Sequence, residues 1–225
     1  VAPSRGLGDV YKRQGSWSPA NPMSNIWSSS YKAIQICNQY LAEFQGLTFD
    51  ELKLNDDYRA QMFRYTNSFK EARFLRAYFY FNLVRAYGDV PYFTEMVTTD
   101  QVNSLTRTPA QEIFNAIIAE CDKLSTELPA DYTKLGLDGI APAENGRVTC
   151  YAALALKARA ALYAASPLFN PGNNKDLWRR AAEANKEVIE TCTANGFKLS
   201  KYSELWGPNN WSNNEMIFVR RYNGN

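Results

Sequence analysis

The stretch that decides the fold is FKEARFLRAYFYFNLVRAYGDVPYFTE, residues 69–95. Seven of its residues between Phe69 and Tyr87 are aromatic, and this part contains neither glycine nor proline, so it reads as a helix. Its aromatic side chains fall on several helical faces, which is typical of a helix packed between other helices. Gly88 and Pro91 predict its end, followed by an extended exit.

The segments before this stretch predict a partner helix. Apolar spacing runs without a breaker from Asp56 into Phe69, so residues 57–87 are expected to form one helix. A second amphipathic pattern over residues 24–45 carries Asn38, which we interpret as a structural buried amide, either satisfied in the core or holding a loop. The two helices would form an antiparallel pair joined by residues 46–55.

The segments after this stretch predict three more helices. Residues 92–106 are expected to be extended, and Thr108 to Gln111 suggest a capping box for a helix ending near Leu128. A long loop over 129–147 leads to an alanine-rich helix capped by Thr149, and residues 175–194 form the last helix. Residues 215–222 alternate like a half-buried strand.

This pattern predicts a mainly all-α protein in which tetratricopeptide-like helix pairs form an α-solenoid, with a short extended segment near the C-terminal end. The 34-residue repeat is not strictly kept, and a four-helix bundle is the less favoured alternative. We expect residues 1–14 to be a non-native leader, because VAPSRGLGDVYKRQ has no periodicity and resembles a translated sequencing adapter. Residues 15–205 would be the helical domain, and residues 206–225 the start of an irregular second half.

The composition excludes several function classes. The formal charge of +2 comes from residues 1–14, and no basic patch predicts a nucleic-acid partner. The chain has no histidine, which removes the usual catalytic triads and the HExxH zinc site. Its four cysteines form no CxxC pair and fall in predicted helices, and no glycine-rich phosphate loop is present. We therefore predict no metal, no cofactor and no enzymatic activity.

Four stretches resemble the signature segments of the SusD/RagB family: EARFLRAYFYFNLVRAYGDVPYFTE, TRTPAQEIFNAIIAECDKL, GRVTCYAALALKARAALYAASPLFN and LWRRAAEANKEVIE. The resemblance implies a cell-surface lipoprotein of the outer membrane in Bacteroidetes-type bacteria, lipid-anchored through a segment upstream of this chain. It implies non-catalytic capture of nutrients, usually oligosaccharides or polysaccharides, and delivery to a SusC-like TonB-dependent transporter. It also implies a tetratricopeptide-like scaffold with an irregular second half, so this chain would hold only part of the ligand site.

Sugar rings stack on flat aromatic side chains that loops expose to water. This criterion selects Trp17, Trp206 and Trp211 as candidate ligand-binding residues, with the neighbouring amides Asn209, Asn210, Asn213 and Asn214 as hydrogen-bonding partners. The alternative is that these loops pack on the scaffold. The helical residues Trp27, Tyr78, Tyr80 and Trp178 are expected in the core.

Charged residues on the predicted helices have structural interpretations as well as functional ones. Arg73, Arg76 and Arg85 invite a substrate-anion hypothesis; the alternatives are a contact with a partner protein or pairing with Glu71, Asp89 or helix ends, and pairing is favoured. Glu112 and Glu120, on one predicted helix, and Glu183, on another, lie on solvated faces, which speaks against a glycosidase carboxylate pair. A helical protein-interaction scaffold without a small ligand remains the alternative function.

Overall fold

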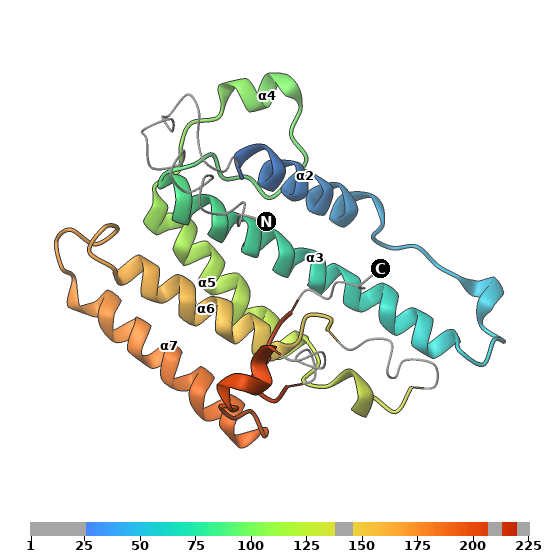
Figure 1. The fold of residues 1–225 in the computed structure, drawn as a ribbon. Coiled ribbons are helices and arrows are strands. Elements are labelled where there is room, and N and C mark those ends of the chain that lie inside the picture. Colours follow the sequence, from blue (N-terminus) through green and yellow to red (C-terminus); the bar gives the residue numbers. More distant parts are fainter. Residues whose placement is uncertain (1–25, 138–145, 207–212, 220–225) are drawn as a thin grey trace, which may run out of the picture.

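The computed structural model describes residues 26–137, 146–206 and 213–219. Its α-helices are α2 (Trp27–Glu43), α3 (Tyr58–Tyr87), α4 (Thr99–Ser104), α5 (Ala110–Glu127), α6 (Cys150–Ala165) and α7 (Lys175–Ala194) (Figure 1). Three short 3₁₀ turns are η1 (Asp50–Leu52), η2 (Tyr132–Lys134) and η3 (Tyr202–Trp206). The described residues contain no β-strand, only one isolated antiparallel bridge between Val90 and Thr108. The predicted all-α class is confirmed.

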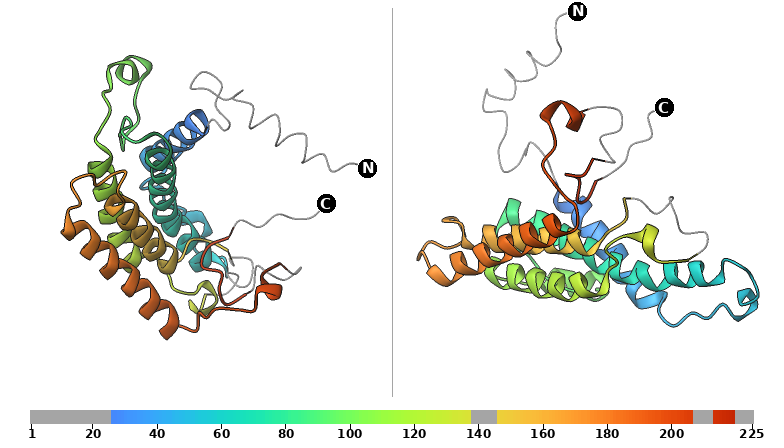
Figure 2. Two further views of the ribbon diagram at one scale, coloured as in Figure 1. Left: turned by 60° about the vertical axis from the view of Figure 1, so that its left-hand side comes forward. Right: turned by 90° about the horizontal axis from the view of Figure 1, so that it is seen from below.

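The long helices lie side by side in one curved layer, and the chain after α7 leaves this layer on one face (Figure 2). Packing follows the chain order, because α2 contacts α3, α3 contacts α5, α5 contacts α6 and α6 contacts α7. This arrangement of successive antiparallel helices is the predicted series of helix pairs.

Helix α3 contacts α2, α5 and α6 and carries many of the buried side chains of the core. Phe74, Tyr80, Phe81, Leu83 and Val84 are all buried on it, between α2 on one side and α5 on the other. Burying one such side chain contributes about 1.5 to 3 kcal/mol, so these residues together anchor the core. Gly88 ends α3 with a φ of +71°, a conformation that strains any residue with a Cβ atom.

The extended exit after α3 is fastened to α2 and α3 by side chains. The hydroxyl of Tyr31 donates to the carbonyl of Pro91 (2.8 Å), and that of Tyr80 donates to Phe93 (2.7 Å). Asn38 is buried, donates to the carbonyl of Glu95 (2.9 Å) and accepts from Arg76 (2.8 Å). Asn38 is therefore both a satisfied core amide and the group that holds the loop.

Helix starts differ from the predicted capping pattern. Thr108 and Gln111 form no capping box, because Pro109 is the N-cap of α5 and the amide of Ala110 donates instead to the Asp89 carboxylate (2.8 Å). A capping box does form at Thr98 and Gln101, where it begins α4 inside the stretch predicted to be extended. The Asp89 carboxylate, from the loop after α3, therefore caps α5 in place of the predicted Thr108 side chain.

Several side chains lie elsewhere than predicted. The expected strand at 215–222 does not form within its described part, residues 215–219, which consists of turn, bend and irregular residues, because the described chain supplies no partner strand. Tyr80 is buried as expected, but Tyr78 and Trp178 each keep 37% of their surface exposed. Arg73 pairs with Glu120 and Glu127 of α5, each at 2.6 Å, rather than with Glu71 or Asp89.

Burial of ionisable side chains predicts loss of stability at alkaline pH. Burial raises the pKa of Cys121 from 9.0 to about 12, and it also raises the pKa values of Tyr31, Tyr80 and Tyr132 above 10.0. The folded state therefore favours the protonated forms, while the unfolded chain ionises near its ordinary values. Stability is fully present below pH 9 and falls as the pH rises from there toward 12. Urea unfolding at pH 7.5, 9 and 11 measures this, and an unfolding free energy that stays constant to pH 11 would contradict it.

Candidate functional site

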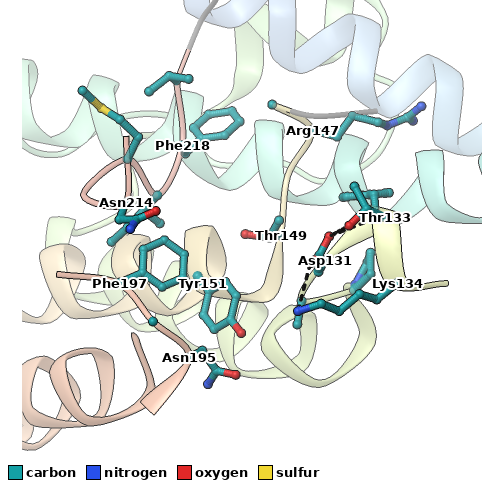
Figure 3. A pocket seen from close by; sticks show the side chains of 18 of the residues that line it. Asp131, Thr133, Lys134, Arg147, Thr149, Tyr151, Asn195, Phe197, Asn214 and Phe218 are labelled. Atoms are coloured by element: carbon teal, nitrogen blue, oxygen red, sulfur yellow. Dashed lines mark hydrogen bonds and ion pairs between the residues drawn. The ribbon is translucent and has the colours of Figure 1, made fainter. Parts of the chain in front are cut away.

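A cavity of about 740 Å³ opens where the loop after α5, the start of α6 and the segment after α7 meet (Figure 3). Four aromatic side chains line it: Tyr132, Tyr151, Phe197 and Phe218. The polar lining comes from Asp131, Thr133, Lys134, Arg147, Thr149, Asn195, Asn213 and Asn214. Apolar walls with a few convergent polar groups are typical of small-ligand sites.

The aromatic walls are fixed by contacts with the helical layer. Tyr151, in the first turn of α6, packs against Phe197 with ring centroids 4.9 Å apart. Phe218 packs edge-on against the buried Phe74 of α3 at 5.5 Å. Gly196, with a φ of +87°, ends α7 and turns the chain toward this contact. The cavity is therefore formed by the segment after α7 folding back onto the layer.

Asp131 supplies the carboxylate of the cavity. Its Oδ1 atom accepts from the backbone amide of Thr133 (2.9 Å) and from the Thr133 hydroxyl (2.6 Å), and Lys134 lies 3.3 Å from its Oδ2 atom. These hydrogen bonds, together with the Lys134 charge, lower the pKa of Asp131 below its ordinary value. The carboxylate stays ionised at neutral pH and can accept hydrogen bonds from ligand hydroxyls.

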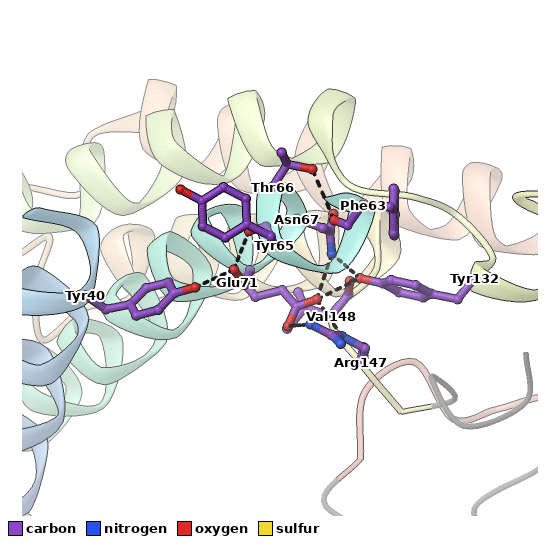
Figure 4. A network of polar contacts seen from close by, with 10 residues as sticks. Tyr40, Phe63, Tyr65, Thr66, Asn67, Glu71, Tyr132, Arg147 and Val148 are labelled. Carbon is purple, nitrogen blue, oxygen red and sulfur yellow. Dashed lines mark hydrogen bonds and ion pairs between the residues drawn. The ribbon is translucent and has the colours of Figure 1, made fainter. Parts of the chain in front are cut away.

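A polar network joins the cavity to α3 (Figure 4). Glu71 pairs with Arg147 through two hydrogen bonds, 2.8 Å to Nε and 2.9 Å to Nη2, and it also accepts from Asn67 (2.7 Å). The amide of Asn67 donates in addition to the Tyr132 hydroxyl (2.8 Å), which donates to the carbonyl of Val148 (2.7 Å). Burial and the Glu71 charge raise the pKa of Tyr132, so its hydroxyl stays protonated. This network fixes both Tyr132 and Arg147 at the cavity.

The sequence-predicted candidates fall in different places. Trp206 ends η3, is 71% exposed and lies beside Tyr202, with ring centroids 5.9 Å apart, but it does not line the cavity. Asn213 and Asn214 do line it. Trp17, Trp211, Asn209 and Asn210 lie outside the described residues.

Sequence reasoning missed most of the cavity lining. Tyr132, Tyr151 and Phe197 were not selected, because each stands next to a helix end and resembles an ordinary packing residue. Two local signals pointed to them: the Asp131-x-Thr133 turn, and Asn195-Gly196 directly before Phe197. Neither signal indicates that the two turns meet in space.

The described residues show neither a metal-binding cluster nor a membrane-spanning helix. Within residues 26–137, 146–206 and 213–219, no group of three or more acidic, cysteine or histidine side chains is placed to hold a metal ion. No helix in the same ranges is both long enough and apolar enough to cross a membrane.

Curated relatives match most of this chain but only part of their own length. SusD-like protein P25 of Formosa agariphila is 22% identical over 197 residues, which is 87% of this chain and 31% of the relative. SusD-like protein P2 of the same organism is 27% identical over 169 residues, which is 74% of this chain and 27% of the relative. The chain therefore spans about a third of the length of P25 and just over a quarter of the length of P2.

Solved structures of the same kind share the fold. A SusD-like carbohydrate-binding protein from Bacteroides fragilis superposes with a TM-score of 0.64 at 28% identity, covering 86% of this chain and 32% of its own. A laminarin-binding SusD-like protein superposes with a TM-score of 0.62 at 26% identity, covering 86% of this chain and 36% of its own. The model of a SusD-like family, described as "Starch-binding associating with outer membrane", matches residues 7–162. The chain belongs to the SusD/RagB family.

Proposed function

We propose that this chain is part of a non-catalytic protein that captures glycans at the outer face of the outer membrane. The observation that carries the proposal is membership of a family described as starch-binding and associating with the outer membrane. The cavity beside α6, together with the exposed ring pair Tyr202 and Trp206, would supply this chain's share of the binding surface.

The mechanism of capture is reversible stacking and hydrogen bonding. The apolar face of a sugar ring stacks on an exposed aromatic ring. The ring of Trp206 is accessible to water and can be stacked on in this way. The side-chain amides of Asn213 and Asn214 can both donate hydrogen bonds to sugar hydroxyl groups and accept them. The Asp131 carboxylate can accept hydrogen bonds from the same hydroxyl groups. Such a site needs no cofactor.

Delivery to a SusC-like TonB-dependent transporter is the second part of the proposal, with attachment to the membrane by a lipid anchor. Support for the partner comes from the family resemblance of the four signature stretches. A barrel protein that co-purifies with the full-length protein, and does so without any glycan, would favour the alternative role of an interaction scaffold.

The acidic residues give no support to a glycosidase. Such enzymes need two carboxyl groups flanking the bond to be cleaved. Among the described residues that line the cavity, Asp131 is the single carboxylate, and Glu120, which does not line it, is paired with Arg73. Binding without turnover is the function that these side chains favour.

Replacing Trp206 with alanine in the full-length protein is expected to weaken glycan binding roughly tenfold, because an exposed stacking surface is lost. Affinity electrophoresis in gels containing starch or laminarin measures this retardation. Trp178→Ala is the matched control, because Trp178 is also partly exposed but lies on α7. If neither polysaccharide retards the unmodified protein, the capture role for these glycans is wrong. If Trp206→Ala binds as well as Trp178→Ala, Trp206 has no part in the site.

A further inference from the structure

A second cavity, of about 580 Å³, lies between the α2–α3 loop and the first half of α3. Its lining comes from the end of α2, from η1 with the residues that follow, and from the first turns of α3. Arg147 lines this cavity as well as the one beside α6, so the Glu71–Arg147 pair stands between them. Nothing in the proposed function uses this second cavity.

The inner wall of the second cavity is aromatic and held in place. The hydroxyl of Tyr65 donates to the carbonyl of Phe44 (2.6 Å) and accepts from the amide of Leu47 (2.9 Å). The ring of Tyr65 packs edge-on against Phe49 at 5.3 Å, and the Tyr40 hydroxyl lies 2.6 Å from the Ser68 hydroxyl. Because both tyrosine hydroxyls are occupied, the rings are fixed in orientation before any ligand arrives.

The rim of the same cavity carries polar groups that the protein does not use. Within the part of the chain that the structure describes, the side chains of Asn55 and Tyr58 make no hydrogen bond or ion pair. Asp57 and Gln61 share one hydrogen bond, 2.9 Å from the amide nitrogen to Oδ2, which leaves Asp57 Oδ1 and Gln61 Oε1 as acceptors. Asn55, Asp57 and Gln61 are exposed, and Tyr58 is half-buried. The rim therefore offers both donors and acceptors around an aromatic wall.

These groups select a class of ligand. An aromatic wall accepts the apolar face of a ring, and amide, carboxylate and phenol groups at the rim hydrogen-bond its hydroxyls. The arginines of this cavity, Arg64 and Arg147, already interact with other groups, so the described lining residues offer no unpaired cation to select an anion. The volume falls within the range of about 300 to 1,000 Å³ for small-ligand pockets. The match is a neutral sugar of one or two rings.

We propose that this cavity is a second carbohydrate subsite, which binds neutral sugar units independently of the cavity beside α6. The inference rests on the proposed function, because it assigns a second binding position to a protein that captures glycans. Two separate subsites on one chain increase the residence time of a long glycan, because the glycan is released only after it has dissociated from both subsites.

Three of the chain's four methionines allow the two cavities to be observed separately. Met62 lines the second cavity, Met216 lines the one beside α6, and Met96 lies at neither. We would label the methionine methyl groups of the full-length protein with ¹³C, assign these three signals by Met→Leu substitution, and titrate with maltoheptaose and with laminarihexaose. The Met62 and Met216 signals are expected to shift with separate half-saturation concentrations, while the Met96 signal stays unchanged.

Tyr58→Ala is expected to weaken the Met62 response about fivefold or more and to leave the Met216 response unchanged. Tyr78→Ala, a partly exposed tyrosine elsewhere on α3, is the matched control and is expected to change neither.

The outcomes separate the two proposals. If Met216 responds to the sugars and Met62 does not, the second subsite is wrong and the proposed function stands. If Met62 responds and Met216 does not, the second subsite stands and the cavity beside α6 is not the glycan site. A Met62 signal that moves with protein concentration alone, and not with sugar, indicates a second copy of the chain as the occupant and overturns the inference.

Discussion

Glu71→Ala is expected to destabilise the protein by about 3 kcal/mol, because one carboxylate holds several groups that are partly or fully buried. Glu71 keeps 16% of its side-chain surface exposed and Arg147 keeps 27%, so water screens the pair only in part. Without the carboxylate, the Arg147 guanidinium loses a bidentate partner and Asn67, which is buried, loses an acceptor. Either loss alone costs more than a typical surface substitution.

Urea unfolding measures this change, and thermal unfolding is expected to show a fall of about 6 to 12 °C. Glu183→Ala is the matched control, since Glu183 is exposed on α7 and makes no side-chain hydrogen bond or ion pair within the described residues, so its effect should stay within about 0.5 kcal/mol. Glu71→Gln should fall between the two, because the amide keeps an acceptor for Asn67 but loses the charge. A Glu71→Ala protein as stable as Glu183→Ala would mean that the network contributes no net stability.

The same substitution connects stability to binding. Arg147 and Tyr132 both line the cavity beside α6. When Glu71 is replaced, Arg147 loses two hydrogen bonds, and the Tyr132 hydroxyl loses the Glu71 Oε1 atom that lies 3.1 Å from it. Glycan affinity should therefore fall together with stability in Glu71→Ala. In Glu183→Ala, neither should change.

The sequence predicted the scaffold well where helix signals are local. Helix α3 begins at Tyr58 and ends at Tyr87, one residue inside its predicted start and at its predicted end, because no breaker interrupts it before Gly88. Helix α7 has its predicted bounds, Lys175 and Ala194. Periodicity and end signals of this kind involve residues within one or two turns of each other, so a single sequence contains them.

The sequence predicted less where the decisive contact is distant. The cap of α5 comes from Asp89, a loop residue 21 positions before the amide that it accepts from. Glu71 and Arg147 are separated by 76 positions, and no local pattern pairs them. Much of the lining of the cavity beside α6 comes from a loop after α5 and a segment after α7, which meet only because the helices between them pack. The sequence predicted that Trp206 would be exposed, because it follows the last helix in a loop-like segment. It could not show that Trp206 lies outside the cavity lining.

Ala160→Leu is expected to destabilise the protein by about 3 kcal/mol or more, because α6 has no free face at this position. Ala160 has 0% of its surface exposed, and α6 packs between α5 and α7 while also contacting α3. Seven alanines of α6 are buried in this way: Ala152, Ala153, Ala158, Ala160, Ala161, Ala164 and Ala165. Small side chains let the neighbouring helix backbones come close, so a leucine must push at least one helix away.

Ala182→Leu on α7 is the control that isolates packing from helix propensity. Ala182 is exposed, and alanine to leucine changes intrinsic helix propensity by only a few tenths of a kcal/mol at either site. The difference between the two variants in urea unfolding therefore measures the space available beside Ala160. If Ala160→Leu unfolds within about 0.5 kcal/mol of Ala182→Leu, the helices around α6 adjust without cost. In that case the alanine content of α6 would not be what sets their spacing, and the interpretation of this helix as a close-packed seam would be wrong.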